Sequence, residues 1–191
     1  MCTITGSSGV GKTTIVKRLQ VLRPDLRLIT SHTSRSARDS DIPGEYNCNI
    51  SQEDFVKNKE DYLWVVVAHG NYYGTTKRSV EDVFVSEASL NSPLLMIIVP
   101  ESVALLRQYL EFMGVDESQI LSFYVLAPNE EELRRRLVAR GDDALSIERR
   151  VSDCKEWDKI ALTSDIPYIF LSNNDSMMGV EPVVRQMSMF F

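Results

Sequence analysis

GSSGVGKT, residues 6–13, is the stretch of this 191-residue chain that predicts its fold. It fits the phosphate-binding pattern G-x-x-x-x-G-K-[ST], the P-loop. Gly6, Gly9 and Gly11 let backbone N–H groups surround an anion, because glycine has no Cβ atom to obstruct it. In such loops the position of Lys12 reaches the β- and γ-phosphates, and the hydroxyl of Thr13 is a ligand for Mg²⁺. The stretch therefore predicts a nucleotide-binding site.

The residues on either side of this loop follow the order that a P-loop requires. Residues 1–5 are rich in β-branched side chains and predict a short buried strand. After the loop, a helix with one apolar face is predicted to begin at Lys12 and to end at Arg23-Pro24. Its amino-terminal dipole points at the phosphates. The predicted ATP-binding residues are Gly6, Ser8, Gly9, Val10, Gly11, Lys12, Thr13 and Thr14.

Short apolar segments alternate with amphipathic segments along the rest of the chain. The predicted strands are 27–31, 63–69, 94–99, 120–127 and 168–171. The predicted helices are 51–57, 80–90, 102–113, 129–140, 146–162 and 180–189, with Ser51 and Asn129 as N-caps, and residues 70–76 are predicted to form a loop. Such alternation is typical of a parallel sheet with helices on both faces. The expected fold class is therefore α/β, a P-loop NTPase three-layer fold in a single domain.

Composition limits the classes of partner. The net charge of −6 argues against a nucleic-acid groove, because phosphate backbones recruit basic surfaces. The three cysteines are scattered without metal-ligand spacing, which favours a reducing, cytoplasmic setting. The strand predicted directly after Met1 leaves no room for a signal peptide, and the longest apolar stretch, 94–99, is too short to span a bilayer. We expect small-molecule partners, no nucleic acid and no membrane.

A second candidate site lies in residues 31–38. Arg35 and Arg38 are three residues apart among small hydroxyl side chains, and two guanidinium groups suit a dianionic phosphate. Phenol donors follow at Tyr46, Tyr72 and Tyr73. The alternative interpretation of this segment alone is a solvated loop with two surface arginines.

Taken together, three segments resemble the guanylate kinase family: the P-loop, residues 31–38 and residues 69–75, HGNYYGT. That family has S-x-T-T-R-x-x-R, a following tyrosine and G-N-Y-Y-G-[ST] in this order. Residues 133–141 and the pair Arg150-Val151 are similar to its lid and the helix that follows. The similarity extends from about residue 3 to about residue 175. It implies a core of residues 1–31, 77–135 and 151–191, a small mixed NMP-binding lobe of residues 32–76, and a lid of residues 136–150.

The resemblance also implies roles for individual residues. It implies that ATP with Mg²⁺ is the phosphate donor and that the acceptor is GMP, dGMP or a related nucleotide. Arg35, Arg38, Tyr46 and Tyr73 match positions that hold the acceptor phosphate, whereas Ser31 and Thr75 match positions that touch its phosphate or base. Arg136, Arg140 and Arg150 match lid and hinge arginines that close over the transferring group. Arg134 and Arg135 are expected on a solvated helix face, paired with Glu130–Glu132.

Two positions depart from the family pattern. Where guanylate kinases have a glutamate that binds the guanine edge, this chain has Trp64, which either stacks on a base or packs in the core of the small lobe. The family also carries acids at the end of the strand matching 94–99, where this chain is apolar until Glu101. Glu101 either replaces the missing acid or is a first-turn glutamate favoured by the helix dipole. Because a site that loses a hydrogen-bonding partner loses discrimination, these changes leave the acceptor open.

Three functions remain at this stage. The first is a nucleoside monophosphate kinase. The second is a kinase on the same scaffold for a sugar phosphate such as ribose 1,5-bisphosphate, for which loss of the base-binding glutamate is natural. The third is a non-catalytic interaction module, which the complete P-loop with Lys12 argues against.

Overall fold

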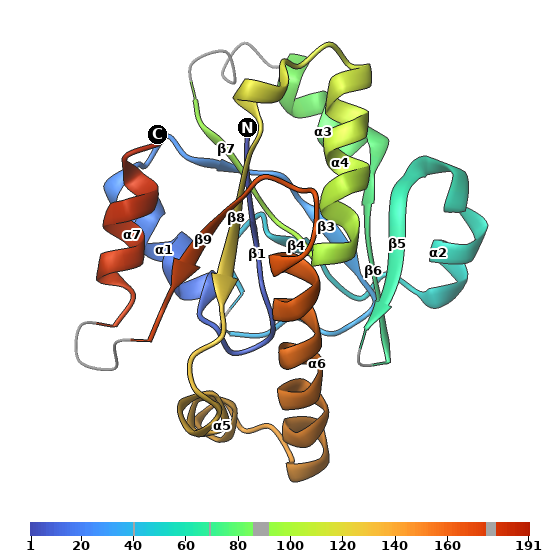
Figure 1. The fold of residues 1–191 in the computed structure, drawn as a ribbon. Helices are drawn as coiled ribbons and strands as arrows, with labels where there is room; N and C mark the ends of the chain where they lie inside the picture. Colours follow the sequence, from blue (N-terminus) through green and yellow to red (C-terminus); the bar gives the residue numbers. More distant parts are fainter. Residues whose placement is uncertain (40, 69, 86–91, 175–178) are drawn as a thin grey trace.

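The computed structural model describes residues 1–39, 41–68, 70–85, 92–174 and 179–191 (Figure 1). A central sheet of five parallel strands has the order β2-β7-β1-β8-β9. Its strands are β1 (Cys2–Thr5), β2 (Arg27–Leu28), β7 (Leu94–Ile97), β8 (Leu121–Leu126) and β9 (Tyr168–Ser172). The α/β prediction with a parallel central sheet is confirmed.

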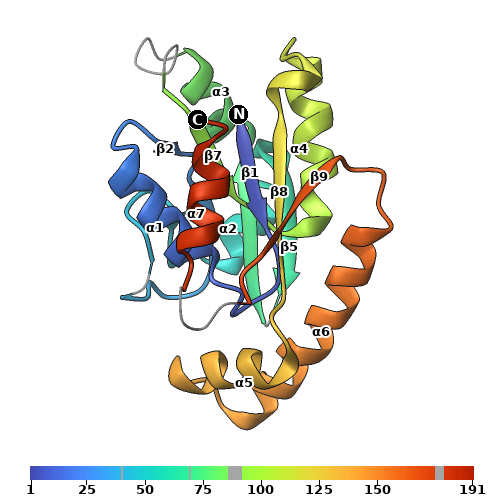
Figure 2. The same cartoon turned by 60° about the vertical axis from the view of Figure 1, so that its left-hand side comes forward.

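Helices cover both faces of this sheet. Helices α1 and α7 lie on one side and α4 and α6 on the other (Figure 2). The α-helices are α1 (Lys12–Leu22), α2 (Gln52–Lys57), α3 (Lys77–Val85), α4 (Pro100–Phe112), α5 (Glu130–Ala139), α6 (Ala144–Leu162) and α7 (Glu181–Ser188). Short 3₁₀ helices are η1 (Lys59–Asp61) and η3 (Glu117–Gln119).

Strand β7 shows why the sheet is buried on both faces. Successive side chains of a strand point to opposite faces. Accordingly, Leu95 and Ile97 belong to the apolar core beneath α1 and α7, whereas Leu94, Met96 and Ile98 belong to the core beneath α3 and α4. A strand with two buried faces has to be apolar throughout, as the sequence of this segment predicts.

A second sheet forms the small lobe and is mixed. Its order is β4-β3-β6-β5, with β3 parallel to β4 and antiparallel to β6. The strands are β3 (Ser31–Thr33), β4 (Tyr46–Asn47), β5 (Tyr62–Ala68) and β6 (Asn71–Thr76). This sheet packs beside α4, and Trp64 of β5 shares an apolar core with Met96 of β7 (Figure 1).

The predicted loop over residues 70–76 is wrong, because Asn71–Thr76 form β6, paired with β3 and β5. Gly74 favours a turn in the sequence, but packing explains it in the structure. A Cβ at Gly74 would lie 2.7 Å from the Tyr62 ring and 2.9 Å from the carbonyl oxygen of Trp64. Glycine inside a strand is typical of such close approach.

The predicted strand 27–31 is also corrected. Arg27–Leu28 join the central sheet as β2, whereas Ser31 begins β3 of the second sheet. The helix predicted over 80–90 begins earlier, at Lys77, and its predicted end falls outside the described residues, as does His69 at the end of the strand 63–69.

The N-caps predicted at Ser51 and Asn129 are confirmed. Each side-chain oxygen accepts a hydrogen bond from the backbone N–H three residues later, at 3.0 Å for Ser51 and 2.9 Å for Asn129. Helix α5 ends before Gly141, whose φ of 87° is the left-handed conformation usual after a helix. Within the described ranges, no helix is both long and apolar enough to cross a bilayer.

Candidate active site

The P-loop connects β1 to α1, and its conformation depends on glycine. Gly6 and Gly9 have φ values of 138° and 89°, which side chains with a Cβ rarely adopt. A Cβ on Gly6 would lie 2.5 Å from the carbonyl oxygen of Val125. One on Gly9 would lie 2.9 Å from a methyl group of Leu133. Both positions therefore need glycine, because the loop packs this closely against β8 and α5.

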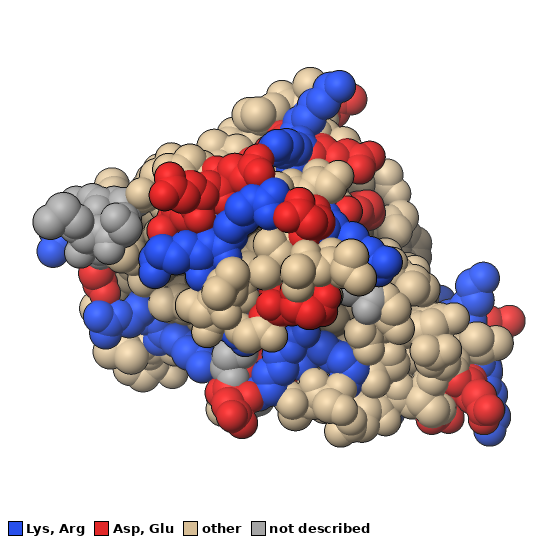
Figure 3. Space-filling view, turned by 90° about the horizontal axis from the view of Figure 1, so that it is seen from below, with Lys and Arg blue, Asp and Glu red and all other residues tan. Residues whose placement is uncertain are grey.

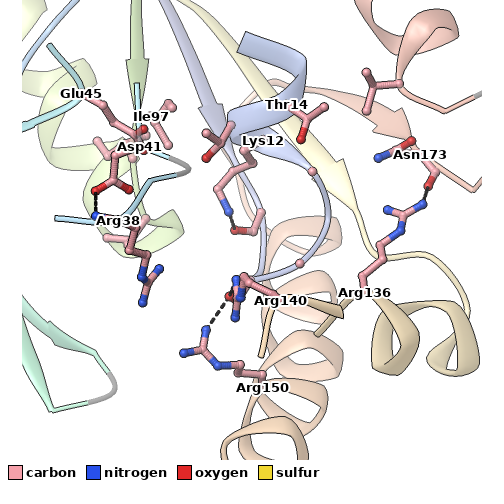
Figure 4. A pocket seen from close by; sticks show the side chains of 18 of the residues that line it. Lys12, Thr14, Arg38, Asp41, Glu45, Ile97, Arg136, Arg140, Arg150 and Asn173 are labelled. Atoms are coloured by element: carbon pink, nitrogen blue, oxygen red, sulfur yellow. Dashed lines mark hydrogen bonds between the residues drawn. The ribbon is translucent and has the colours of Figure 1, made fainter. Parts of the chain in front are cut away.

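Lys12 folds back over this loop. Its Nζ donates hydrogen bonds to the carbonyl oxygens of Gly6 at 2.7 Å and Ser7 at 2.8 Å (Figure 4). Burial disfavours the charged form and lowers the pKa of Lys12 to about 8, while the nearby carboxylate of Glu45 acts in the opposite direction. The carboxylate of Glu45 thus offsets only part of the effect of burial on the charged form of Lys12.

This lowered pKa predicts how ATP affinity depends on pH. The cationic form of Lys12 attracts phosphates, so binding weakens as Lys12 loses its proton above about pH 8. If only the cationic form binds, the dissociation constant of ATP rises about tenfold between pH 7 and pH 9. Titration with a fluorescent ATP analogue measures it. A flat profile over this range would show that Lys12 does not titrate there.

Three arginines lie near the loop: Arg136 in α5, Arg140 at the C-terminal end of α5, and Arg150 in α6. Arg140 and Arg150 each donate from Nη1 to Oγ of Ser8, at 3.0 and 2.5 Å (Figure 4). Arg136 donates to the carbonyl oxygen of Asn173 at 3.0 Å and to Glu132 at 2.7 Å. Arg140 and Arg150 thus meet at Ser8, whereas Arg136 reaches the loop separately, with Nη1 3.5 Å from the carbonyl oxygen of Val10 (Figure 4).

Arg150 has the most unusual environment of the three. Its side chain is buried, and burial, followed by the charge of Arg140, lowers its pKa. Its Nε has no hydrogen-bond partner, and the carboxylate of Asp142 lies 3.4 Å away. A buried donor without a partner is costly, so an anion that accepted from Nε would be bound favourably.

The outer face of α5 carries the arginines that were expected in solvent. Arg134 pairs with Glu130 at 2.8 Å and with Glu148 of α6 at 2.5 Å. Arg135 pairs with Glu132 at 2.7 Å and is exposed, although it also reaches the edge of the cleft. The predicted pairing of both residues with Glu130–Glu132 is confirmed.

The second sheet supplies the opposite side of the cleft. Its lining includes Arg35, Arg38, Tyr46 and Tyr73, which we call the acceptor side. Arg35 makes two hydrogen bonds of 2.8 Å to the carboxylate of Asp41, and its guanidinium carbon lies 4.8 Å from the ring centre of Tyr46. Two phenols and two guanidinium groups on one wall are suited to a phosphate dianion.

Both sides line one cleft of about 810 Å³, together with the P-loop residues Gly6, Ser8, Gly9, Gly11, Lys12, Thr13 and Thr14. Viewed from this end, Lys and Arg side chains gather in bands with acidic side chains between them (Figure 3). The net charge of −6 therefore coexists with local cationic surface. Val10 does not line the cleft, because its side chain is buried. Its carbonyl oxygen accepts a hydrogen bond from the side-chain amide of Asn173 at 2.7 Å.

The predicted base-contacting residues do not line the cleft. Ser31 and Thr75 are buried and their hydroxyls hydrogen-bond to each other at 2.9 Å. Trp64 is 7% exposed and belongs to the core cluster that also contains Ile98. The structure thus places Trp64 in the packing role, not against the acceptor.

Because Trp64 is buried, introducing at this position the glutamate that guanylate kinases have is expected to destabilise the fold. Trp64→Glu would leave a carboxylate in the apolar core, so we expect it to lower the free energy of unfolding by at least about 3 kcal/mol. We expect no gain in GMP turnover. Urea unfolding and kinetics with GMP measure the two effects, with Trp64→Phe as the control. A stable variant with improved GMP turnover would place position 64 at the acceptor instead.

Glu101 is likewise absent from the lining. It is exposed in the first turn of α4, after Pro100, where a carboxylate is stabilised by the helix dipole. The end of β7 contributes Ile97, Ile98 and Val99 to the cleft instead. This part of the wall is apolar.

The structure adds lining residues that the sequence analysis did not propose, among them Asp41, Glu45, Trp157 and Asn173. Glu45 is a buried carboxylate, and burial raises its pKa. Asn173 has a buried side-chain oxygen without a hydrogen-bond partner. Asn173 could have been predicted from the sequence as a site residue, because it directly follows the last strand, at the carboxyl edge where such sheets bind ligands.

A parallel sheet with a glycine-rich loop between β1 and α1 defines a P-loop nucleotide-binding fold. The guanylate kinase family matches residues 1–159. A guanylate kinase from Symbiobacterium thermophilum is 31% identical over 174 residues, which cover 90% of this chain and 76% of that protein. One from Prochlorococcus marinus (strain MIT 9313) is 31% identical over 188 residues, 93% of both. The chain belongs to the guanylate kinase family.

A solved structure supports the same fold. The crystal structure of guanylate kinase from Anaplasma phagocytophilum aligns with a TM-score of 0.59 at 20% sequence identity. The alignment covers 98% of this chain and 81% of that one.

Proposed function

We propose that the chain is an ATP-dependent nucleoside monophosphate kinase that phosphorylates GMP, dGMP or a related nucleotide to the diphosphate. The main support is the arrangement of cations in one cleft. Lys12 lies on the donor side, Arg35 and Arg38 lie on the acceptor side, and the arginines of α5 and α6 adjoin both.

This arrangement suits phosphoryl transfer. An oxygen of the acceptor phosphate attacks the γ-phosphorus of ATP, the bond to the β-phosphate oxygen breaks, and ADP leaves. The protein has to align the two phosphates and stabilise the negative charge that spreads over the transferred group. Arg140 and Arg150, which meet at Ser8, are the groups closest to that task. A closed lid also excludes water, which would otherwise hydrolyse ATP.

Mg²⁺ fits this site as a companion of ATP. Thr13 lines the cleft directly after Lys12 and supplies one hydroxyl ligand. In the part of the chain that the structure describes, no cluster of three or more His, Cys, Asp or Glu residues could hold a metal ion. Mg²⁺ in kinases needs no such cluster, because nucleotide phosphates and water complete its coordination and the ion neutralises phosphate charge.

One observation favours a second candidate, a kinase of a sugar phosphate such as ribose 1,5-bisphosphate. Trp64 is in the core, and Ser31 and Thr75 are bonded to each other. The positions that the family resemblance assigns to the acceptor's phosphate or base are thus buried outside the lining of the cleft. An acceptor without a base would need no base contact from them.

The test is ADP formation from ATP and Mg²⁺ by the purified chain, with each ribo- and deoxynucleoside monophosphate and with ribose 1,5-bisphosphate. The first proposal predicts the highest kcat/KM for a nucleotide, and the second predicts it for the sugar phosphate. No turnover with any acceptor, together with no binding of ATP, would reject both and leave a non-catalytic module.

A further inference from the structure

Helix α6 contributes an aromatic side chain, Trp157, to the lining of the cleft. Trp157 is partly exposed there. The same cleft is also lined by Ala68 of β5, Asn71 of β6 and the apolar residues Ile97 and Val99. Of these four lining residues, Asn71 alone has a polar side chain.

The position of Trp157 on α6 directs it toward the acceptor. Trp157 follows Arg150 by seven residues, about two helical turns, so both side chains leave the same helix face. Arg150 lies close enough to Arg38 and Tyr73 of the acceptor side to interact with them electrostatically. The face of α6 that carries Trp157 therefore borders the acceptor phosphate site.

Two features mark this indole as available to a ligand. Among the described residues, none accepts a hydrogen bond from its N–H, and none stacks on its ring. The other tryptophan of the chain, Trp64, is in contrast buried in the core. Aromatic rings of this kind supply a large flat surface and one polar donor.

We infer that Trp157 is the surface on which the base of the acceptor nucleotide stacks, so that the acceptor is bound by its phosphate and by the plane of its base. This inference rests on the proposed nucleotide kinase function and names its acceptor class. Stacking is tolerant of base identity, because every base has a π-face. Hydrogen-bonding sites, by comparison, reject an analogue that lacks the partner by a factor of about 10⁴. We therefore expect purine and pyrimidine monophosphates to be used with similar kcat/KM.

Trp157→Ala tests the role of the ring. Loss of base stacking onto an aromatic side chain should raise the acceptor KM between about fivefold and 150-fold for every nucleotide used, with little change in kcat or in the KM for ATP. Trp157→Phe, which keeps an aromatic face, should restore most of the affinity. Glu156→Ala, an exposed neighbour on α6, is the surface control. An unchanged acceptor KM in Trp157→Ala would overturn the inference, as would equal losses in the alanine and phenylalanine variants.

Fluorescence gives a readout that does not require turnover. The chain has only two tryptophans, so nucleotide stacking should quench the emission of Trp157 and leave that of Trp64. GMP and CMP should quench the native protein but not Trp157→Phe, and ribose 5-phosphate, which has no base, should quench neither. Quenching without any turnover would support the stacking surface while rejecting the kinase. Turnover of a nucleotide without quenching would reject the stacking surface while keeping the kinase.

Discussion

Lys12→Ala is expected to lower kcat/KM for ATP by at least about 10³-fold while leaving the fold intact. The ammonium group is the cation that lies directly over the loop, bonded to the carbonyl oxygens of Gly6 and Ser7. If the loop holds the donor phosphates as proposed, Lys12 exchanges these carbonyl contacts for phosphate oxygens when ATP binds. Alanine removes this charge at the place where negative charge develops during transfer.

Kinetics and thermal unfolding together measure this effect. Lys17→Ala is the matched control, because Lys17 is an exposed lysine on the same helix. It should change neither activity nor stability by a measurable amount. A Lys12→Ala protein that unfolds like the native chain yet retains its activity would show that the loop does not hold the donor phosphates.

Arg150→Ala should lower kcat by about 10³-fold, with a smaller effect on ATP binding. Arg150 is buried beside Ser8, and its Nε lacks a hydrogen-bond partner. In the proposed kinase, such a donor would stabilise the charge that appears only when the phosphoryl group moves between the two substrates. Asp142 provides the closest opposing charge, and at 3.4 Å it is not hydrogen-bonded to that nitrogen.

Arg149→Ala provides the comparison, because Arg149 is adjacent on α6 but exposed. Steady-state kinetics and a separate ATP-binding titration distinguish the two effects. If Arg150→Ala weakened ATP binding as strongly as it slowed turnover, Arg150 would belong to ground-state binding of the donor. If neither changed, its place beside Ser8 would have no role in the reaction.

The elements that could be predicted from the sequence are those determined by local rules. The P-loop has required residues at fixed spacing, and β7 is apolar because both of its faces are covered. Helix α5 is preceded by an N-capping asparagine and followed by glycine. Each of these signals lies within about ten residues of the element that it determines.

The errors occur where distant segments decide the structure. Gly74 is in a strand because the ring of Tyr62 and the backbone of Trp64 approach it from β5, which its neighbours in the sequence do not indicate. The segment 27–31 divides between two sheets because Arg27–Leu28 pair with β7 and Ser31 with β4. Trp157 enters the cleft from a helix that follows the P-loop by more than a hundred residues, and no local pattern identifies it.

Gly9 links the P-loop to α5 and, through the core between them, to α6. The space that a Cβ would take is already bordered by the methyl groups of Leu133 and Leu137, which form the small core between α5 and α6 together with Ile147 and Val151. Leu133 and Leu137 therefore pack against the P-loop and also fix how α5 packs on α6, the helix that carries Arg150. Substitutions in this core cannot adjust one property alone. In a series of enlarged or reduced side chains at Leu137, ATP affinity and the proposed turnover should rise and fall together, so Leu133 and Leu137 constrain both properties in any redesign of the protein.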